Sequence, residues 1–465
     1  MKVSAASRTY LLGAILCVAL MVCSLNFGDR GGPYFMASLA LAGVAYLLAV
    51  RELFAAERFP RRVVLIGLIL AAVWHFAFLR LPSGPDDDIH RYVWDGRLQR
   101  LGFNPYVVIP SDPAVRALHT PETRTLNNPD LPSPYPAGAQ LFFRAVTAIH
   151  ESTFVMKVAF VICDFGIVLV LLDLLRSRKR GAHLVLAYAW NPLLAIEVAG
   201  TGHIDIVGAL LLTISAAALV RRWRAIAALA LGLAVAVKFL PVVLLPLYWK
   251  RIRIRHAVLA IAVVALLYVP FLNRGRIPTG SLSAFVQGFR FNGPVFATLA
   301  RIAPPQLLVA LAALIGFSVA TWLRGAEPDW SPGAFAWPMA ASLFFAPVVF
   351  PWYLLWLLPF LTSASTLLLI VWTVSIFPTY VMWHLRALGH SWGTLPSWVM
   401  LLEYGCLAAT GMIIAFHRRS RPSAPPYSEV LVQDNVLGQH TISVSETPTI
   451  SSRPTSVQFT QERCP

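Results

Sequence analysis

The sequence predicts an all-α polytopic membrane protein. Hydrophobic residues make up 57% of the 465 residues, charged residues only 13%, and the mean hydropathy is +0.66. A soluble domain carries a charged share of about 25%. The apolar residues fall in runs separated by short basic or Pro-rich stretches, and about 17–25 consecutive apolar residues suffice to cross a bilayer as a helix. Together these observations argue against a soluble globular enzyme.

The apolar runs predict a bundle of 12 to 14 transmembrane helices. The first run resembles a signal peptide, but it has no clear small-residue cleavage site, so we expect it to be retained. The two short runs on either side of Lys238 can instead form one re-entrant hairpin. The expected spans lie near residues 10–26, 34–50, 63–80, 154–175, 183–199, 204–220, 225–237, 239–249, 257–272, 305–323, 334–350, 352–364, 365–383 and 397–416.

Basic residues gather on one side of this topology. Cytoplasmic loops of membrane proteins are enriched in Lys and Arg, so this side is predicted to be cytoplasmic, with both termini on it. The net charge of +16 then reflects orientation in the membrane, and we expect no nucleic-acid partner. The clusters are Arg58 with Arg61 and Arg62, and the runs 176–180, 221–224, 250–255 and 418–421.

A long polar loop, residues 81–153, separates the first three spans from the rest and is predicted to face away from the cytoplasm. Its segment 81–152 carries eight carboxylates and six arginines. Residues 89–101 have the pattern of a short amphipathic helix, and a second helix is expected at about 138–149, along the membrane interface. The predicted domains are therefore 1–80 (three spans), 81–153 (a loop with amphipathic helices), 154–417 (the main bundle) and 418–465 (a disordered cytoplasmic tail).

Three consecutive carboxylates, Asp86, Asp87 and Asp88, open the polar part of this loop. Adjacent carboxylates repel one another, so one member can be basic enough to accept a proton near neutral pH and act as a general base. Two alternatives remain open for the same residues. Asp is a common helix cap, which favours the positive end of the helix dipole, and neighbouring carboxylates also suit a divalent metal ion.

Several polar motifs occur along the chain in a fixed order. They are DDDIHRYVWDGR (86–97), GFNPY (102–106), NPDLPSPYP (128–136), WNP (190–192) with Glu197, GHID (202–205), KFLP (238–241) and PWY (351–353). In this order they resemble the motifs of GT-C glycosyltransferases, and most closely those of the bacterial polyprenol-phosphate-mannose-dependent mannosyltransferases. The turn around Tyr135 departs from that family's usual Thr-Ile-Tyr-Pro-Pro, and His90 stands where Tyr is usual. These departures bear on the sugar and the acceptor more than on the class.

The resemblance implies an inverting glycosyltransferase of the plasma membrane. Its donor would be a polyprenyl-phosphate-linked hexose, mannose above all, and its acceptor an extracytoplasmic glycan, lipid or protein. The resemblance favours Asp87 as the base, together with Asp88, and Asp86 comes next. A transporter or flippase of lipid-linked sugars is the alternative from a different class. Transporters keep polar groups near the bilayer midplane and often show repeats, whereas this sequence gathers its carboxylates at one surface and shows no repeat.

Cationic candidates for the donor phosphate are Lys238, Arg91 and Arg290. Lys238 lies in the apolar stretch LAVAVKFLPVVLLP, where an ammonium group costs ~3 kcal/mol or more unless it finds a partner or water. It is a phosphate ligand or, alternatively, a lysine that reaches toward the membrane interface. Arg91 and Arg290 have the same two interpretations, phosphate contact or surface charge.

The remaining candidates are expected to contact the sugar or the acceptor. The pair His203 and Asp205 can orient a hydroxyl group or cap the next span, and Glu197 is a carboxylate within an apolar run, which is suspect by default. Aromatic rings stack on sugars but also anchor proteins at membrane interfaces, and anchoring is the stronger expectation for all of them except Tyr135. The expected substrate-binding residues are Tyr135, His203, Asp205, Glu197, Asn104, Tyr106, Trp352 and Tyr353. The five scattered cysteines predict no disulfide or metal framework.

Overall fold

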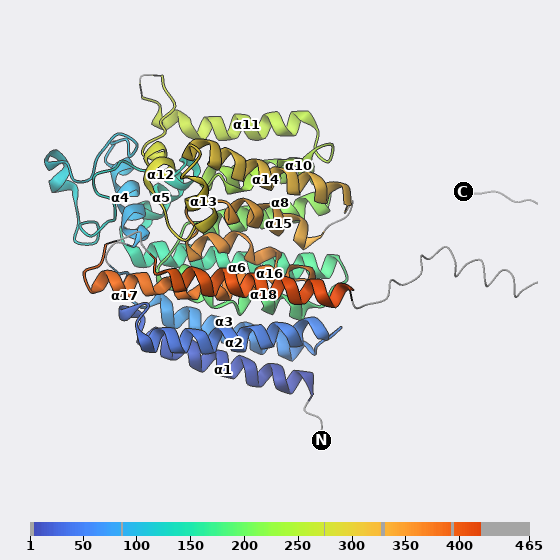
Figure 1. Cartoon of the computed structure of the whole chain (residues 1–465). Helices are drawn as coiled ribbons and strands as arrows, with labels where there is room; N and C mark the ends of the chain where they lie inside the picture. The colour runs from blue at the N-terminus through green and yellow to red at the C-terminus, as the bar shows by residue number, and fades with distance from the viewer. Residues whose placement is uncertain (1–3, 85–86, 274, 327–330, 392–394, 420–465) are drawn as a thin grey trace, which may run out of the picture. The chain divides into compact units, whose positions relative to one another are not determined.

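The structure is a bundle of helices (Figure 1). It is a computed structural model that describes residues 4–84, 87–273, 275–326, 331–391 and 395–419. Within these ranges there is no β-strand, only two isolated bridges, which confirms the all-α prediction. The longest helices are α1 (Ala5–Leu25), α2 (Pro33–Ala55), α3 (Arg61–Leu79), α6 (Thr153–Ser177), α14 (Pro305–Ala326) and α18 (Ser397–Arg419), together with α11 (Ile254–Tyr268), whose span continues to Phe271.

Shorter helices connect and cover these long ones. The α-helical ones are α4 (Asp88–Arg100), α5 (Ala137–Ile149), α7 (Val185–Ala189), α8 (Asp205–Val220), α9 (Arg224–Val237), α10 (Leu245–Tyr248), α12 (Leu282–Gly288), α13 (Pro294–Leu299), α15 (Pro332–Phe344), α16 (Leu367–Ser375) and α17 (Val381–Ala387). Short 3₁₀ helices are η1 (Phe27–Asp29), η2 (Pro113–Leu118), η3 (Ala182–Leu184), η5 (Leu240–Leu244), η6 (Val269–Phe271), η7 (Pro351–Trp356), η8 (Leu358–Phe360), η9 (Ala364–Thr366) and η10 (Phe377–Tyr380). The segment η4 (Leu194–Gly200) is a π-helix.

Eight helices in the described ranges are long and apolar enough to cross a membrane, or up to nine if one bent pair counts as a single span. The chain is therefore a polytopic membrane protein, but the expected 12 to 14 spans exceed this number. Several of the apolar segments form helices of only 16, 14 and 13 residues, namely α8, α9 and α15. A helix rises about 1.5 Å per residue, so these are shorter than the roughly 30 Å hydrocarbon core.

The bent pair breaks at the Trp190-Asn191-Pro192 motif. The segments Ala182–Ala189 and Leu194–Gly200 meet at an angle of 65°. Proline disfavours a helical conformation in the residue before it and supplies no N–H. The Asn191 side chain caps the second segment by accepting from the Leu193 N–H at 3.0 Å, and it donates to the Thr373 hydroxyl at 2.8 Å. The motif thus redirects the chain and fixes the π-helix that carries Glu197.

The helices expected in the long loop are both present. Helix α4 begins one residue before the predicted 89–101 segment, and α5 begins one residue before the predicted 138–149 segment. The two pack closely because Gly96 faces α5: a Cβ at this position would lie 2.5 Å from the Phe143 carbonyl oxygen. The ring of Tyr92 stacks on that of Phe143 at 4.5 Å, so α4 is held firmly against α5.

The basic turns and the long loop lie at opposite ends of the helices that join them. Helix α6 begins at Thr153, directly after the loop, and ends at Ser177, within the basic run 176–180. Helices α8 and α9 form an antiparallel pair around the basic turn 221–224, so Asp205 and Lys238 return to the loop end. In Figure 1, α4, α5 and α12 lie together at this end.

The chain divides into two units of contacts, residues 1–412 and 413–465. The first contains one large hydrophobic core that extends from α1 to α18 and includes the fully buried rings of Trp74, Trp190 and Trp356. The second unit is described only as far as residue 419, the end of α18. The predicted tail beyond that point therefore lies outside the described residues, and the predicted domain boundaries remain expectations.

Candidate active site

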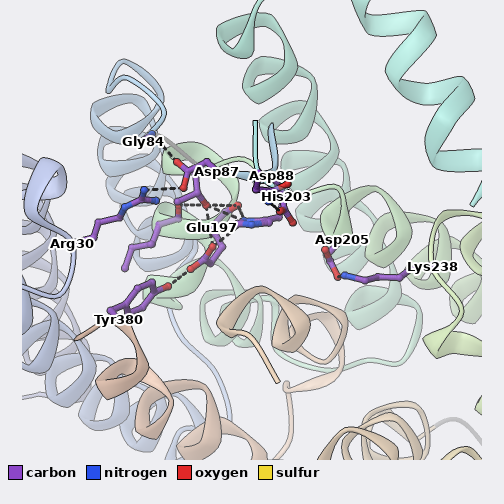
Figure 2. A network of polar contacts seen from close by, with 12 residues as sticks. Arg30, Gly84, Asp87, Asp88, Glu197, His203, Asp205, Lys238 and Tyr380 are labelled. Carbon is purple, nitrogen blue, oxygen red and sulfur yellow. Dashed lines mark hydrogen bonds and ion pairs between the residues drawn. The ribbon is translucent and has the colours of Figure 1, made fainter. Parts of the chain in front are cut away.

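A cavity of about 620 Å³ opens at the loop end of the bundle. Its walls come from the long loop, η4, the end of α9, α12 with the segment after it, η7, η10 and α17. Ten of the residues that the sequence singled out line it, and Figure 2 shows several of them converging. They are Asp87, Asp88, Arg91, Tyr135, Glu197, His203, Lys238, Arg290, Trp352 and Tyr353.

The carboxylate of Asp87 has both oxygen atoms occupied. Arg30 donates to Oδ1 at 2.8 Å, and the backbone N–H of Gly84 donates to Oδ2 at 2.7 Å. Both side chains of this ion pair are less than 10% exposed. Each oxygen of this carboxylate thus accepts a hydrogen bond from the protein, and neither is directed freely at a substrate.

Asp88 lies beside it as the first residue of α4, and Figure 2 shows it close to His203. The Asn127 side chain donates to Oδ1. No ion pair to Asp88 occurs within the described ranges. Burial raises the pKa of the Tyr135 phenol and the neighbouring Asp88 carboxylate raises it further, so the phenol stays protonated beside this carboxylate. Asp88 therefore differs from Asp87 in having no cationic partner among the described residues.

Glu197 is the centre of a buried network on the cavity floor. Tyr380 donates to Oε1, and the Thr201 hydroxyl donates to Oε2 at 2.9 Å. Nδ1 of His203 lies 2.9 Å from the same Oε2 (Figure 2). Glu197 lies in the π-helix η4, and such segments are frequent at functional sites.

His203 connects that network to the aromatic wall. Its ring stacks on Trp352 with the centroids 4.0 Å apart. Burial alone would lower the pKa of His203, but the hydrogen bond to Glu197 and the negative charges around it outweigh burial, so the pKa is raised. The charges that raise it are those of Glu197, Asp88 and Asp205, so the His203 ring lies among carboxylates at the cavity wall.

Lys238 forms a second charged pair with Asp205. Its Nζ lies 2.7 Å from Oδ1 of Asp205, which also accepts from the Trp356 indole at 2.7 Å. The ammonium lies over the Tyr353 ring, 4.0 Å from its centroid. Asp205 is fully buried and its Oδ2 has no hydrogen-bond partner among the described residues, while the Lys238 side chain is 24% exposed. The helix α9 ends at Val237 and Lys238 is extended, so its position results from this break.

Arg91 and Arg290 line the cavity, but their guanidinium groups contact backbone carbonyls. Arg91 donates to the carbonyls of Leu131, Asn127 and Asn128, and thereby folds the segment that carries Asn127 against α4. Arg290 donates to the carbonyls of Val286, Gln287 and Phe289, in and next to α12. Both arginines therefore shape the cavity wall through the backbone.

Asn104 and Tyr106 do not line the cavity. Asn104 donates to the Phe271 carbonyl at 2.8 Å, and the Tyr106 hydroxyl donates to the Tyr135 carbonyl at 2.7 Å. They tie the long loop to the end of α11 and hold the turn that carries Tyr135. Asp86 lies outside the described residues. Within the described ranges, no three His, Cys, Asp or Glu side chains are grouped as a metal site would require.

Sequence reasoning missed three polar partners of the predicted residues: Arg30, Tyr380 and Asn127. Arg30 follows η1 in the short loop between α1 and α2. This loop lies on the face where the functional residues were predicted, so its charged residue could have been recognised as a candidate. Asn127 immediately precedes a motif that was recognised. Tyr380 lies in an apolar stretch near α17, and nothing in the local pattern distinguishes it from an interface aromatic.

A buried network around Asp95 supports the turn that carries Tyr135. The hydroxyl of Ser133 and the amide of Gln140 both donate to Asp95 Oδ2, the latter at 2.9 Å. Asp95 is fully buried, and within the part of the chain that the structure describes its Oδ1 has no hydrogen-bond partner. Burial raises the pKa of Asp95 to about 6, even though the charge of Arg91 and the two hydrogen bonds lower it.

We expect Asp95 to make stability depend on pH. The folded-state pKa of about 6 lies above the ordinary value of 3.8, so folding favours the protonated form. Protonated Asp95 therefore contributes roughly 3 kcal/mol to the free energy of unfolding. This contribution is fully present below pH ~4 and is lost as the pH rises through ~6. In thermal unfolding experiments, the gain in stability between pH 7.5 and pH 5 should be larger for the wild type than for Asp95→Asn. The exposed Asp130→Asn is the control; equal pH dependence in the wild type and Asp95→Asn would contradict this assignment.

One family model matches the sequence over residues 17–252, and its description is "Alpha-(1->6)-mannopyranosyltransferase, N-terminal domain". The match covers slightly more than half of the 465 residues. It includes α4, α5 and η4, and it ends after Lys238, so it contains most of the cavity's polar residues. No curated protein and no solved structure matches the chain. The comparisons give no support to the transporter alternative.

Proposed function

Because the chain belongs to this family of membrane alpha-mannosyltransferases, we propose that it transfers mannose from a polyprenyl-phosphate donor to an acceptor outside the cytoplasm, in an alpha-(1->6) linkage. The observation that carries the proposal is the cavity at one end of the membrane helices. Asp88, a carboxylate that forms no ion pair among the described residues, lines it together with Lys238, which lies at the end of an apolar helix. A base and a phosphate-binding cation are what this transfer requires.

In the proposed reaction a hydroxyl oxygen of the acceptor attacks the anomeric carbon of mannose while Asp88 takes the hydroxyl proton. The bond between the anomeric carbon and the phosphate oxygen breaks, and polyprenyl phosphate leaves with the electron pair. Lys238 stabilises the charge that develops on the phosphate. A single displacement of this kind inverts the anomeric configuration. The imidazole ring of His203 and the phenol of Tyr135 are suited to form hydrogen bonds with the sugar hydroxyls.

The donor is tested with the purified protein in liposomes, with membranes from a deletion strain as the source of acceptor. We expect radiolabelled mannose to be transferred from polyprenyl-phosphate mannose and not from a nucleotide-linked mannose. The product anomer, determined by linkage-specific glycosidases, should be alpha. Efficient transfer from the nucleotide sugar would overturn the proposed donor, whereas the family assignment would stand.

The same proposal includes the orientation of the chain. Ser111 in the long loop and Ser177 at the basic end of α6 are both exposed. With the five native cysteines changed to serine, Ser111→Cys should react with a membrane-impermeant maleimide in intact cells, and Ser177→Cys should react only after permeabilisation. The reverse pattern would place the cavity on the cytoplasmic face. Labelling of both residues in intact cells would show that the membrane barrier is compromised and that the cells must be replaced by sealed vesicles of known orientation.

A further inference from the structure

A basic groove lies at the end of α9 remote from the cavity. It is formed by the turn before α9 and the turn before α11, two helices that pack against each other, and its volume is about 510 Å³. Since α9 has 14 residues, the groove and Lys238 are separated by about 20 Å along the helix. Six of the residues that line it are basic or aromatic: Arg222, Trp223, Arg224, Arg253, Arg255 and His256.

The positive charge of this groove is not balanced by the protein. No acidic residue lines it, and none of its four arginines forms an ion pair within the described ranges. The adjacent Arg221 is different, because its guanidinium pairs with Asp173. Four like charges in one groove repel one another, so an anion from outside the chain would be attracted to it.

Two helix starts add to this attraction. Helix α9 begins at Arg224 and α11 begins at Ile254, and both starts border the groove. Neither N-cap residue, Trp223 or Arg253, accepts a hydrogen bond through its side chain. The first N–H groups of a helix lack acceptors within the helix and favour negative charge. The Arg224 N–H already donates to the Arg222 carbonyl and the His256 N–H to the Arg253 carbonyl, both at 2.9 Å. The groove thus offers the other N–H groups of the two first turns, as well as guanidinium groups, to an anion.

The apolar surroundings indicate that the anion belongs to a lipid. The Trp223 ring is 56% exposed at the groove, and Ile226 beside it is 46% exposed. Exposed tryptophan is typical of the headgroup region of a membrane. Helix α11 leads away from the groove and begins a candidate membrane span, Ile254–Phe271. Only 11% of this span is buried inside the protein, so acyl chains can cover its surface. A phosphate in the groove would therefore lie at the depth of lipid headgroups.

We propose that this groove binds the phosphate of an anionic phospholipid headgroup. The arginines and the two helix starts hold the phosphate, and the exposed apolar surfaces of α9 and α11 contact the acyl chains. The proposal concerns a site apart from the cavity, and it does not depend on the proposed mannosyl transfer. Free inorganic phosphate shares the headgroup's chemistry but would gain nothing from the apolar surfaces.

The test is native mass spectrometry of the full-length protein in an uncharged detergent, titrated with dioleoylphosphatidylglycerol or dioleoylphosphatidylcholine. We expect a tightly bound phosphatidylglycerol in the wild type. Arg224→Gln/Arg253→Gln should weaken that binding about 30-fold, since each arginine near a lipid surface contributes about fivefold. The matched control is Arg61→Gln/Arg62→Gln, which removes two exposed arginines from the first turn of α3, and it should retain the affinity.

Three results would overturn the proposal. Unchanged phosphatidylglycerol affinity in Arg224→Gln/Arg253→Gln would show that the groove is not the site, and an equal loss in the control would show that only net charge matters. Displacement of the lipid by an equal concentration of inorganic phosphate would assign the groove to the free anion. Arg222→Gln/Arg255→Gln supplies a second pair should the first prove unstable, with the same expected loss. Mannosyl transfer in detergent should stay unchanged in each of these variants.

Discussion

Replacing Asp88 by Asn is expected to reduce sugar transfer by ~10²–10⁴-fold, the usual contribution of a general base. Asn keeps the size and one hydrogen-bond acceptor of the side chain, so the Asn127 contact can persist, but it cannot take the acceptor's proton. Initial rates with saturating polyprenyl-phosphate mannose would measure the effect. Donor affinity should change little, because in the proposed geometry the base contacts the acceptor.

The neighbouring Asp87 provides the discriminating comparison. Asp87→Asn removes the charge that pairs with Arg30, so it should lower thermal stability as well as activity, because breaking a buried ion pair leaves a charge unpaired. Asp88→Asn should leave thermal stability nearly unchanged. The exposed Asp130→Asn controls for loss of charge in the same loop. If Asp88→Asn keeps more than a tenth of the wild-type rate, the base is a different residue.

Replacing Lys238 by Met should weaken binding of a non-transferable polyprenyl-phosphate sugar by ~10–100-fold, since a hydrogen bond to a charged group contributes about 1.5–3 kcal/mol. The single variant also leaves Asp205 buried without its cation, which destabilises the fold. The double variant Lys238→Met/Asp205→Asn removes both charges. It should recover stability but not donor affinity, and this separates phosphate binding from the structural ion pair.

Two further outcomes test the role of Lys238. Lys238→Arg should retain part of the affinity, because a guanidinium also binds phosphate but with a different shape. If the double variant binds the donor as tightly as the wild type does, Lys238 does not bind the phosphate and its ammonium group has only a structural role. Calorimetry in detergent would report both affinities, with Asp205→Asn alone as the control for loss of the carboxylate.

Much of the fold could be predicted from the sequence, because the membrane imposes a simple rule on apolar length. The spans α1, α2, α3 and α6 follow from runs of apolar residues, and α4 and α5 follow from the amphipathic pattern of the loop. The number of spans was overestimated because the same rule does not distinguish a full span from a broken or short helix. Pro192 was a local signal of such a break, but the 65° bend depends on packing against the neighbouring helices.

The candidate site was predictable where its residues are neighbours in the sequence. Asp87 and Asp88 are consecutive, and His203 lies in a motif with Asp205. The sequence does not reveal which group each charged side chain contacts. The pairing of Arg30 with Asp87 joins residues 57 positions apart, and the use of Arg91 by backbone carbonyls depends on how the loop closes. The pairing of Arg30 with Asp87 is why we propose Asp88 as the base, where the sequence alone favoured Asp87.

The pairing of Lys238 with Asp205 has a consequence for turnover. In the proposed reaction the donor is a phosphodiester with one negative charge, whereas the departing polyprenyl phosphate is a monoester with up to two. A lone lysine would hold the more highly charged product more tightly than the substrate and the enzyme would be inhibited by its own product. Because Asp205 already neutralises much of the ammonium charge, the carboxylate weakens retention of the product and favours its release into the membrane.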